Sequence, residues 1–262
     1  MPTALIVEDE PAANKLLSML VQLRGYQSES AYTGGEALAK VGQRRPDVVF
    51  LDLMLPDTNG YEVCTRLKAD RQTSLIPIVM VTARLAEENR IKGFQVGADE
   101  YIPKPYTPDQ IFQALVTTAA RRRDLQQQDG TGAIRLGARG VVEQARELSR
   151  LRSVLLSKTP LDEEAAARIV AALKALWTEA DAWGKANQKD PVATVRYQLH
   201  PDHVALTVCD EAGWFGGGQL PPVEGIGPFG LAGPFDEARP AETGRAVVLT
   251  KRYPAGKPSP AP

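Results

Sequence analysis

The chain has 262 residues, with 31 basic and 32 acidic side chains and a formal net charge of −1. The length suits two domains of ordinary size, and the balanced charge leaves no basic excess for a nucleic-acid backbone. The two cysteines, one in each half, exclude a disulfide framework, and no apolar run is long enough for a membrane span. We therefore expect a cytoplasmic protein of two domains that binds neither nucleic acid nor membrane.

The first half of the sequence alternates short apolar segments with segments of helical periodicity. Strands are predicted at Ala4–Val7, Ser28–Ala31, Asp47–Leu53, Ile76–Val81 and Tyr101–Ile102. Helices are predicted from Pro11 to about Leu23 and at Gly34–Val41, Gly60–Lys68, Ala86–Val96 and Pro108–Arg121. Apolar strands that alternate with helices predict a parallel sheet covered on both faces. Five such units predict a flavodoxin-like doubly wound α/β domain over residues 1–120, with strand order 2-1-3-4-5.

The periodic pattern breaks at residues 121–132, which hold three consecutive arginines, three consecutive glutamines and two glycines. We interpret the arginines as the solvated end of the fifth helix and the remaining residues as a linker. A basic patch for a nucleic-acid partner is the alternative. It is disfavoured because no aromatic residues interleave with the charges.

The second half begins with helices and continues with strands. Helices are predicted at Val141–Leu156 and from Thr159 or Asp162 to about Ala186. Strands are predicted at Ala193–Leu199, Val204–Cys209 and Arg245–Lys251, with a Gly- and Pro-rich stretch, Gly213–Pro240, before the last one. This order predicts an α/β sandwich over residues 133–253, followed by a disordered Pro-rich tail at 254–262.

Four short motifs stand at the ends of predicted strands in the first half. They read Val7-Glu8-Asp9-Glu10, Leu51-Asp52-Leu53-Met54-Leu55-Pro56, Val81-Thr82-Ala83 and Lys104-Pro105. In order and spacing they resemble the receiver domain of two-component response regulators, over roughly residues 3–120. One such motif would be weak, whereas four at strand ends are specific.

The same residues predict a chemistry without the family name. Glu8 and Asp9 end the first strand and Asp52 ends the third, which is its neighbour in the predicted sheet. Ligands bind in the crevice at the carboxyl ends of such strands. Crowded carboxylates repel one another, and Mg²⁺ is the hard cation that suits them. Asp52 would then attack a phosphoryl donor in line while the metal neutralises charge on the transferred group.

Thr82 and Lys104 end the fourth and fifth strands, where a hydroxyl and an ammonium can bind phosphoryl oxygens. The resemblance implies that the main-chain carbonyl of Met54 is a further metal ligand. It also implies a cis bond between Lys104 and Pro105, and that Tyr101 is the aromatic residue that follows the threonine inward after phosphorylation.

Two features qualify the resemblance. Glu8 replaces a second aspartate of the commonest pattern, although its longer side chain still reaches the metal or a metal-bound water. The alternative to an active receiver is an inert domain in which Asp52 and Lys104 form a structural ion pair. It is disfavoured because the acidic residues and the lysine are all present.

Residues 133–253 resemble the ATPase-like domain of anti-sigma-factor serine kinases, of the histidine-kinase/gyrase type. The resemblance rests on the helix Leu173–Pro191, the segments Val208–Phe215 and Gly225–Gly227, and the last strand. It implies that Glu179 corresponds to the family's glutamate and Asp210 to the aspartate that binds adenine. It also implies that Gly213, Gly225 and Gly227 belong to the family's glycine boxes. Trp183, however, stands where the family has a Mg²⁺-binding asparagine, and Trp214 replaces a glycine.

These departures predict a pseudokinase output domain for which ATP is not a ligand. A working serine kinase gated by the receiver is the enzyme alternative, favoured by Glu179, Asp210 and the glycines and opposed by Trp183. A transcription factor is disfavoured, because residues 133–262 hold 16 basic and 15 acidic residues and no helix-turn-helix followed by a basic helix. The only two histidines, His200 and His203, lie in a predicted turn, so neither is expected to be a phosphodonor.

The sequence thus predicts phosphorelay signalling in which the receiver catalyses its own phosphorylation and dephosphorylation on Asp52. The expected partners are a cognate histidine kinase and a regulatory protein of the sigma or anti-sigma type. A homodimer is left open.

Overall fold

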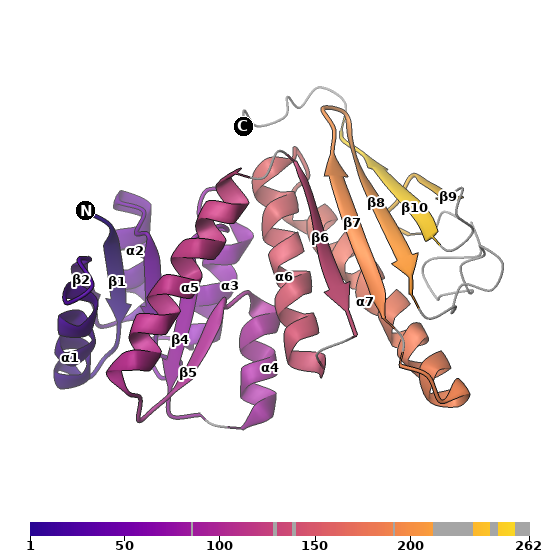
Figure 1. The fold of residues 1–262 in the computed structure, drawn as a ribbon. Helices are drawn as coiled ribbons and strands as arrows, with labels where there is room; N and C mark the ends of the chain where they lie inside the picture. The colour runs from indigo at the N-terminus through magenta and orange to yellow at the C-terminus, as the bar shows by residue number, and fades with distance from the viewer. Residues whose placement is uncertain are drawn as a thin grey trace. The chain divides into compact units, whose positions relative to one another are not determined.

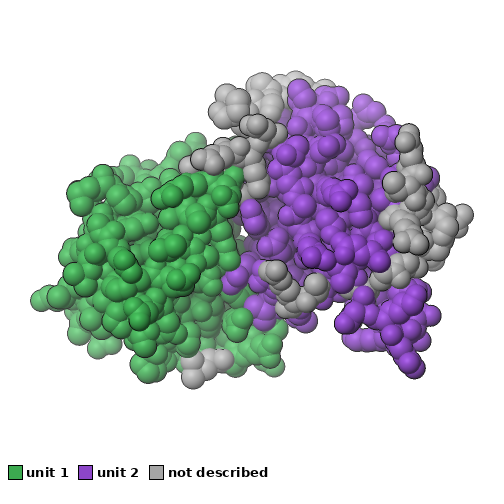
Figure 2. Space-filling view, viewed as in Figure 1, with its two compact units in different colours: residues 1–127 green, residues 128–262 purple. Residues whose placement is uncertain are grey.

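The computed structural model describes residues 1–84, 86–127, 130–137, 140–190, 192–211, 233–241 and 246–254. The chain divides into two compact units, residues 1–127 and 128–262 (Figure 2). The boundary falls inside the stretch where the sequence predicts a linker. Among the described helices, none combines the length and the apolar character needed to cross a membrane.

The first unit is built on a parallel sheet with strand order β2-β1-β3-β4-β5, which confirms the predicted topology (Figure 1). Its strands are β1 (Thr3–Val7), β2 (Gln27–Ala31), β3 (Val48–Leu51), β4 (Ile78–Thr82) and β5 (Glu100–Pro103). Its helices are α1 (Pro11–Gln22), α2 (Gly34–Gln43), α3 (Gly60–Ala69), α4 (Glu87–Val96) and α5 (Pro108–Gln127). Val7 of β1 pairs with Ala31 on one side and with Leu51 on the other. The carboxyl ends of β1 and β3 therefore lie side by side.

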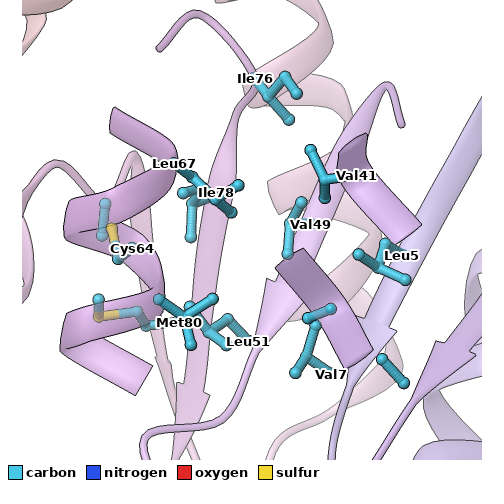
Figure 3. Packing of buried hydrophobic residues seen from close by; sticks show 14 of the residues in the cluster. Leu5, Val7, Val41, Val49, Leu51, Cys64, Leu67, Ile76, Ile78 and Met80 are labelled. Carbon is cyan, nitrogen blue, oxygen red and sulfur yellow. The ribbon is translucent and has the colours of Figure 1, made fainter. Parts of the chain in front are cut away.

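Apolar side chains cover both faces of this sheet, as the continuous apolar strands predict. Leu5 and Val7 pack with residues of α2 and α3, in the cluster that Figure 3 shows. Ala4 and Ile6, which alternate with them along β1, pack with residues of α1 and α5. Every residue of the three central strands β1, β3 and β4 is buried, so the middle of the sheet has no solvated face.

A buried ion pair joins helix α3 to the amino ends of two strands. The Lys68 ammonium donates to the Asp99 carboxylate at 2.9 Å and to the carbonyls of Ser74 and Ile76 at 3.1 and 2.9 Å. The same Asp99 oxygen accepts from the Ile78 amide at 2.9 Å. The lysine side chain is only 5% exposed, so these oxygens replace its water.

The arginines at the end of α5 differ from the sequence prediction. Arg121 donates to the Asp99 carbonyl at 2.8 Å, and Arg122 pairs with the Asp47 carboxylate at 2.6 Å. Two of the three arginines thus anchor the helix to the sheet, and they are not simply a solvated end. Helix α5 consequently runs to Gln127, beyond residue 121 where the sequence predicts the linker to begin.

The second unit has an antiparallel sheet with strand order β6-β7-β8-β10-β9. Its elements are β6 (Thr131–Leu136), α6 (Gly140–Lys158), α7 (Glu163–Asn187), β7 (Ala193–Leu199), β8 (His203–Asp210), β9 (Glu237–Pro240) and β10 (Ala246–Arg252). The two helices and three of the strands follow the sequence prediction to within a few residues. The edge strands β6 and β9 were not predicted, and β6 occupies the end of the predicted linker.

Helix α7 begins at Asp162, whose side chain accepts from the Ala165 amide at 2.9 Å. Its buried residues Leu173 and Leu176 line a small apolar gap with Val195 and Val208 of the sheet. The helices therefore pack on the antiparallel sheet, as the element order predicts. Most of the predicted Gly- and Pro-rich stretch, residues 212–232, and the tail after Pro254 lie outside the described residues.

We expect Lys68→Met to lower the local free energy of unfolding of the first unit by about 3 kcal/mol, because the half-buried Asp99 carboxylate loses its cation and two carbonyls lose their donor. Native-state hydrogen exchange of the β4 amides measures this free energy. Lys15→Met is the matched control, since Lys15 is an exposed lysine of α1. Equal losses in the two variants would contradict a structural role for Lys68.

Candidate functional site

Three carboxylates gather at the carboxyl edge of the first sheet. Glu8 directly follows β1, and Asp52 directly follows β3 and donates its amide to the Val7 carbonyl at 2.9 Å. One oxygen from each of Glu8, Asp9 and Asp52 lies within 4.8 Å of the others. Glu8 and Asp52 are buried, whereas Asp9 is exposed. The strand register thus brings together the three acidic residues that the sequence singled out.

Lys104 supplies the positive charge of this cluster. It follows β5, and its ammonium lies 2.6 Å from a Glu8 oxygen and 2.5 Å from an Asp52 oxygen. Its amide donates to the Thr82 carbonyl at 2.8 Å, which fixes the chain next to β4. The predicted cis bond between Lys104 and Pro105 is present.

Burial and charge act in opposite directions on these groups. Burial raises the pKa of the Glu8 carboxyl, although the hydrogen bond and charge of Lys104 oppose it. Burial alone would lower the pKa of the Lys104 ammonium, but its hydrogen bonds to Asp52 and Glu8, with their charges, raise it above the ordinary value. Three carboxylates facing one ammonium leave an excess of negative charge when all are ionised.

This donor set fits a hard divalent cation. The carboxylates of Glu8, Asp9 and Asp52 offer oxygen ligands, and Asp9 is open to the water that Mg²⁺ usually retains. Met54 lies next to the cluster, and its amide donates to Asp52 Oδ1 at 3.1 Å. The role of its carbonyl as a ligand remains a prediction.

The main chain of Arg84 links the two residues predicted to act as a switch. Thr82 is fully buried, and its hydroxyl accepts from the Arg84 amide at 3.3 Å. The Tyr101 hydroxyl donates to the Arg84 carbonyl at 2.6 Å. Burial raises the pKa of the Tyr101 phenol to about 12, so it is a neutral donor at physiological pH. Sequence reasoning singled out Thr82 and Tyr101 but missed the residue between them.

Asp57 is a second residue that sequence reasoning missed. Its two carboxylate oxygens accept from the amides of Gly34 and Gly35, each at 2.8 Å, at the start of α2. These backbone hydrogen bonds, that of Gly35 first, lower the pKa of the Asp57 carboxyl. They anchor the loop after Asp52 to α2, the helix that precedes β3 in the chain. The available signal was an acidic residue in a short loop together with two glycines at a predicted helix start.

The residues singled out in the second unit are only partly described. Glu179 is exposed on α7, Trp183 lies one turn later, and Asp210 is buried at the end of β8. Gly213, Gly225 and Gly227 lie outside the described residues, as does Trp214. The described residues therefore do not include all of the residues that the resemblance assigns to a nucleotide site.

Comparison with known families agrees with the geometry of the first unit. The family described as "Response regulator receiver domain" matches residues 4–116. Residues 4–116 are a response regulator receiver domain. This match is the basis of the function proposed below. The match ends before the second unit.

The relatives and solved structures match part of the chain. The transcriptional regulatory protein BaeR of Escherichia coli is 39% identical over 165 residues, which are 62% of this chain and 65% of that protein. The phosphate regulon transcriptional regulatory protein PhoB of Pseudomonas aeruginosa is 40% identical over 119 residues, 45% of this chain and 52% of that protein. The chain thus spans about half to two thirds of these relatives. A putative response regulator from Chloroflexus aurantiacus aligns with a TM-score of 0.45 and 33% identity, over 46% of this chain and all of that one.

The raised pKa of Lys104 predicts a specific pH dependence for the receiver's stability. The ion pairs of Lys104 stabilise the fold fully below its ordinary pKa of 10.5, and this contribution is lost as the pH rises through the higher folded value. The stability difference between the wild type and Lys104→Met should therefore be constant at neutral pH and shrink in strongly alkaline solution.

Thermal unfolding of both proteins as a function of pH measures this difference, with Lys15→Met as the control for an exposed lysine. If the stability difference between the wild type and Lys104→Met grew with pH, the stabilising role of the Lys104 ion pairs would be contradicted. The pKa of the Glu8 carboxyl should be higher in Lys104→Met than in the wild type, because the opposing cation is gone. Carbon NMR of the Glu8 carboxyl, followed over a pH titration, measures this difference.

Proposed function

We propose that Asp52 is the phosphoacceptor of the receiver, with Glu8, Asp9 and the Met54 carbonyl as ligands of a catalytic Mg²⁺. The observation that carries the proposal is the carboxylate cluster itself. A buried Asp52 lies within 4.8 Å of Glu8 and Asp9 and 2.5 Å from the Lys104 ammonium. These are the groups that phosphoryl transfer to a carboxylate needs: a nucleophile, charge neutralisation and a cation for the product.

In the proposed reaction, an Asp52 oxygen attacks the phosphorus of a phosphohistidine on a cognate histidine kinase. A new O–P bond forms, the N–P bond breaks, and the electron pair stays on the histidine nitrogen. When bound, Mg²⁺ neutralises charge on the transferred group. Lys104, already 2.5 Å from Asp52, pairs with a phosphoryl oxygen of the product. Hydrolysis of the acyl phosphate in the same site returns the receiver to its resting state.

The proposed signal runs through Arg84. Once the Thr82 hydroxyl donates to a phosphoryl oxygen, it is drawn toward Asp52 and away from the Arg84 amide that it contacts at rest. The Arg84 carbonyl, which accepts a hydrogen bond from the Tyr101 hydroxyl, then moves relative to that hydroxyl. Phosphorylation thereby shifts the balance between two arrangements of the segment around Arg84, which follows β4, and of Tyr101. A homodimer or a partner protein would read that shift.

For the second unit we propose a degenerate ATPase-like output domain, a pseudokinase that signals by protein contact. Trp183 supports loss of nucleotide chemistry, because an indole offers one donor and no oxygen to anchor Mg²⁺. A sigma- or anti-sigma-type regulatory protein is the partner class that the resemblance suggests. The alternative, a receiver-gated serine kinase, is favoured by one observation: Asp210, the proposed adenine reader, is buried at the end of β8.

Transcriptional control, the role printed in the names of the relatives, is not what we propose for this chain. Residues 133–262 hold 16 basic and 15 acidic residues, a net charge of +1. Such a balance gives little attraction for a phosphate backbone. The described helices of the second unit, α6 and α7, are followed by an antiparallel sheet and not by a third helix.

The phosphoacceptor assignment predicts that acetyl phosphate and Mg²⁺ add one phosphoryl group to the protein, detected by mass spectrometry. Asp52→Asn should remain unlabelled, because an amide is not a nucleophile here. Asp109→Asn, a change of an exposed carboxylate on α5, should be labelled like the wild type. Labelling of Asp52→Asn at the wild-type rate would overturn the assignment, and chelation of Mg²⁺ should abolish labelling of the wild type.

The pseudokinase assignment predicts at most millimolar binding of ATP, a free energy of about −4 kcal/mol. A single hydrogen bond donated by the adenine amine to Asp210 contributes only about 0.5–1.5 kcal/mol. Calorimetry of the full chain with ATP and Mg²⁺ measures the affinity, with Asp210→Asn to locate the site. Micromolar binding that is lost in Asp210→Asn would establish the kinase alternative instead.

A further inference from the structure

Helix α4 carries a glycine exactly where the Tyr101 ring lies against it. A Cβ built on Gly93 would stand 2.9 Å from the Met80 sulfur and 3.2 and 3.4 Å from the Tyr101 ring carbons Cδ2 and Cε2. Gly93 lies inside α4 and has no positive φ, so the backbone does not require glycine there. What the position requires is space, and a glycine in a helix interior is otherwise unfavourable.

The two neighbours of this space differ in how freely they can move. Met80 and Tyr101 are paired across β4 and β5, so their side chains share one face of the sheet. Met80 is fully buried in the cluster with Leu51 and Cys64 (Figure 3). Tyr101 is half-buried at the edge of that cluster, so its ring has room to shift that Met80 lacks, at the cost of the hydrogen bond from its hydroxyl to the Arg84 carbonyl. A side chain at position 93 would therefore displace the tyrosine.

We propose that Gly93 is a positioning residue for Tyr101, because the missing side chain leaves the space that the phenol ring occupies. This inference deepens the proposed function and rests on it only where it concerns signalling. The Tyr101 ring lies against α4 at Gly93, and its hydroxyl donates to the Arg84 carbonyl in the segment after β4. The helix and this segment therefore set the position of Tyr101 together. A methyl group at position 93 moves the ring off the Arg84 carbonyl and separates Tyr101 from Thr82.

The experiment compares Gly93→Ala with Gly42→Ala in the full chain. Gly42 lies in α2, and a Cβ there meets nothing within 4 Å, so this variant controls for the general effect of alanine in a helix. Tyrosine-selective carbon NMR reads the ring position, with Tyr101→Phe to assign the signal, and the amide shift of Arg84 reads the hydrogen bond. We expect Gly93→Ala to shift both signals and to lower the thermal midpoint by about 2–4 °C. Gly42→Ala should change neither signal and should not lower the midpoint.

A double-mutant cycle identifies which neighbour resists the methyl group. In a Tyr101→Ala background, Gly93→Ala should no longer lower the midpoint, whereas in a Met80→Ala background most of its effect should persist. The opposite pattern would show that Gly93 serves the packing of Met80, and it would overturn the proposal. So would Tyr101 and Arg84 signals in Gly93→Ala that match those of the wild type.

The signalling part of the proposal is tested by adding acetyl phosphate and Mg²⁺ to the same samples. The Tyr101 signal of the wild type and of Gly42→Ala should change on phosphorylation, and that of Gly93→Ala should not. If the wild type is not phosphorylated at all, the proposed function fails while the resting-state NMR and the cycle still decide the role of Gly93. If all three proteins respond alike, Gly93 does not position the ring for signalling.

Discussion

The contact of one ammonium with two buried carboxylates is the interaction on which the receiver site depends. Glu8 and Asp52 leave water at the edge of the sheet, a cost that is large unless each charge is paired. Lys104 offsets that cost from the end of β5, two strands away from Asp52 in the sheet. Only the parallel order of the sheet places these three strand ends on one edge. The strand order of the sheet therefore also determines which charges meet at the site.

The loop after Asp52 shows how closely the backbone is fitted around this cluster. A Cβ on Gly60 would stand only 2.2 Å from the Asp52 carbonyl oxygen, so α3 starts directly against the residue that carries the site. The Asn59 side chain caps that helix by accepting from the Tyr61 amide at 2.9 Å. Asp57 ties the same loop to α2. A short loop held at both ends keeps the amide of Met54 on Asp52.

The features of the receiver that could be predicted are those that require particular residue types at particular places in the sequence. The receiver sheet, its order and the cluster of Glu8, Asp9, Asp52 and Lys104 were predictable, because continuous apolar strands and charged residues at their ends leave few arrangements. The roles of Arg84 and Asp57 were not, since a main-chain bridge leaves no mark on residue type and an exposed aspartate is common.

The edge strands of the second unit were missed for a related reason. Only Ile134 and Leu136 of β6 are buried, so its alternation is too short to stand out. Strand β9 has four residues, all at least partly exposed. Arg121 and Arg122 were read as solvated because a run of charges usually is, whereas their partners, Asp47 and Asp99, lie far away in the sequence.

Along helix α7, the residues that pack and the glutamate that the resemblance singles out lie on different faces. Leu173, Leu176 and Ala180 are buried and hold the helix, whereas Glu179, between them, is exposed. The positions that the resemblance assigns to nucleotide chemistry are thus not the ones that bury most apolar surface. A change at such a position costs little stability, because the free energy of packing resides on the opposite face. Helix α7 can therefore tolerate substitutions on its exposed face and still keep its packing against the sheet.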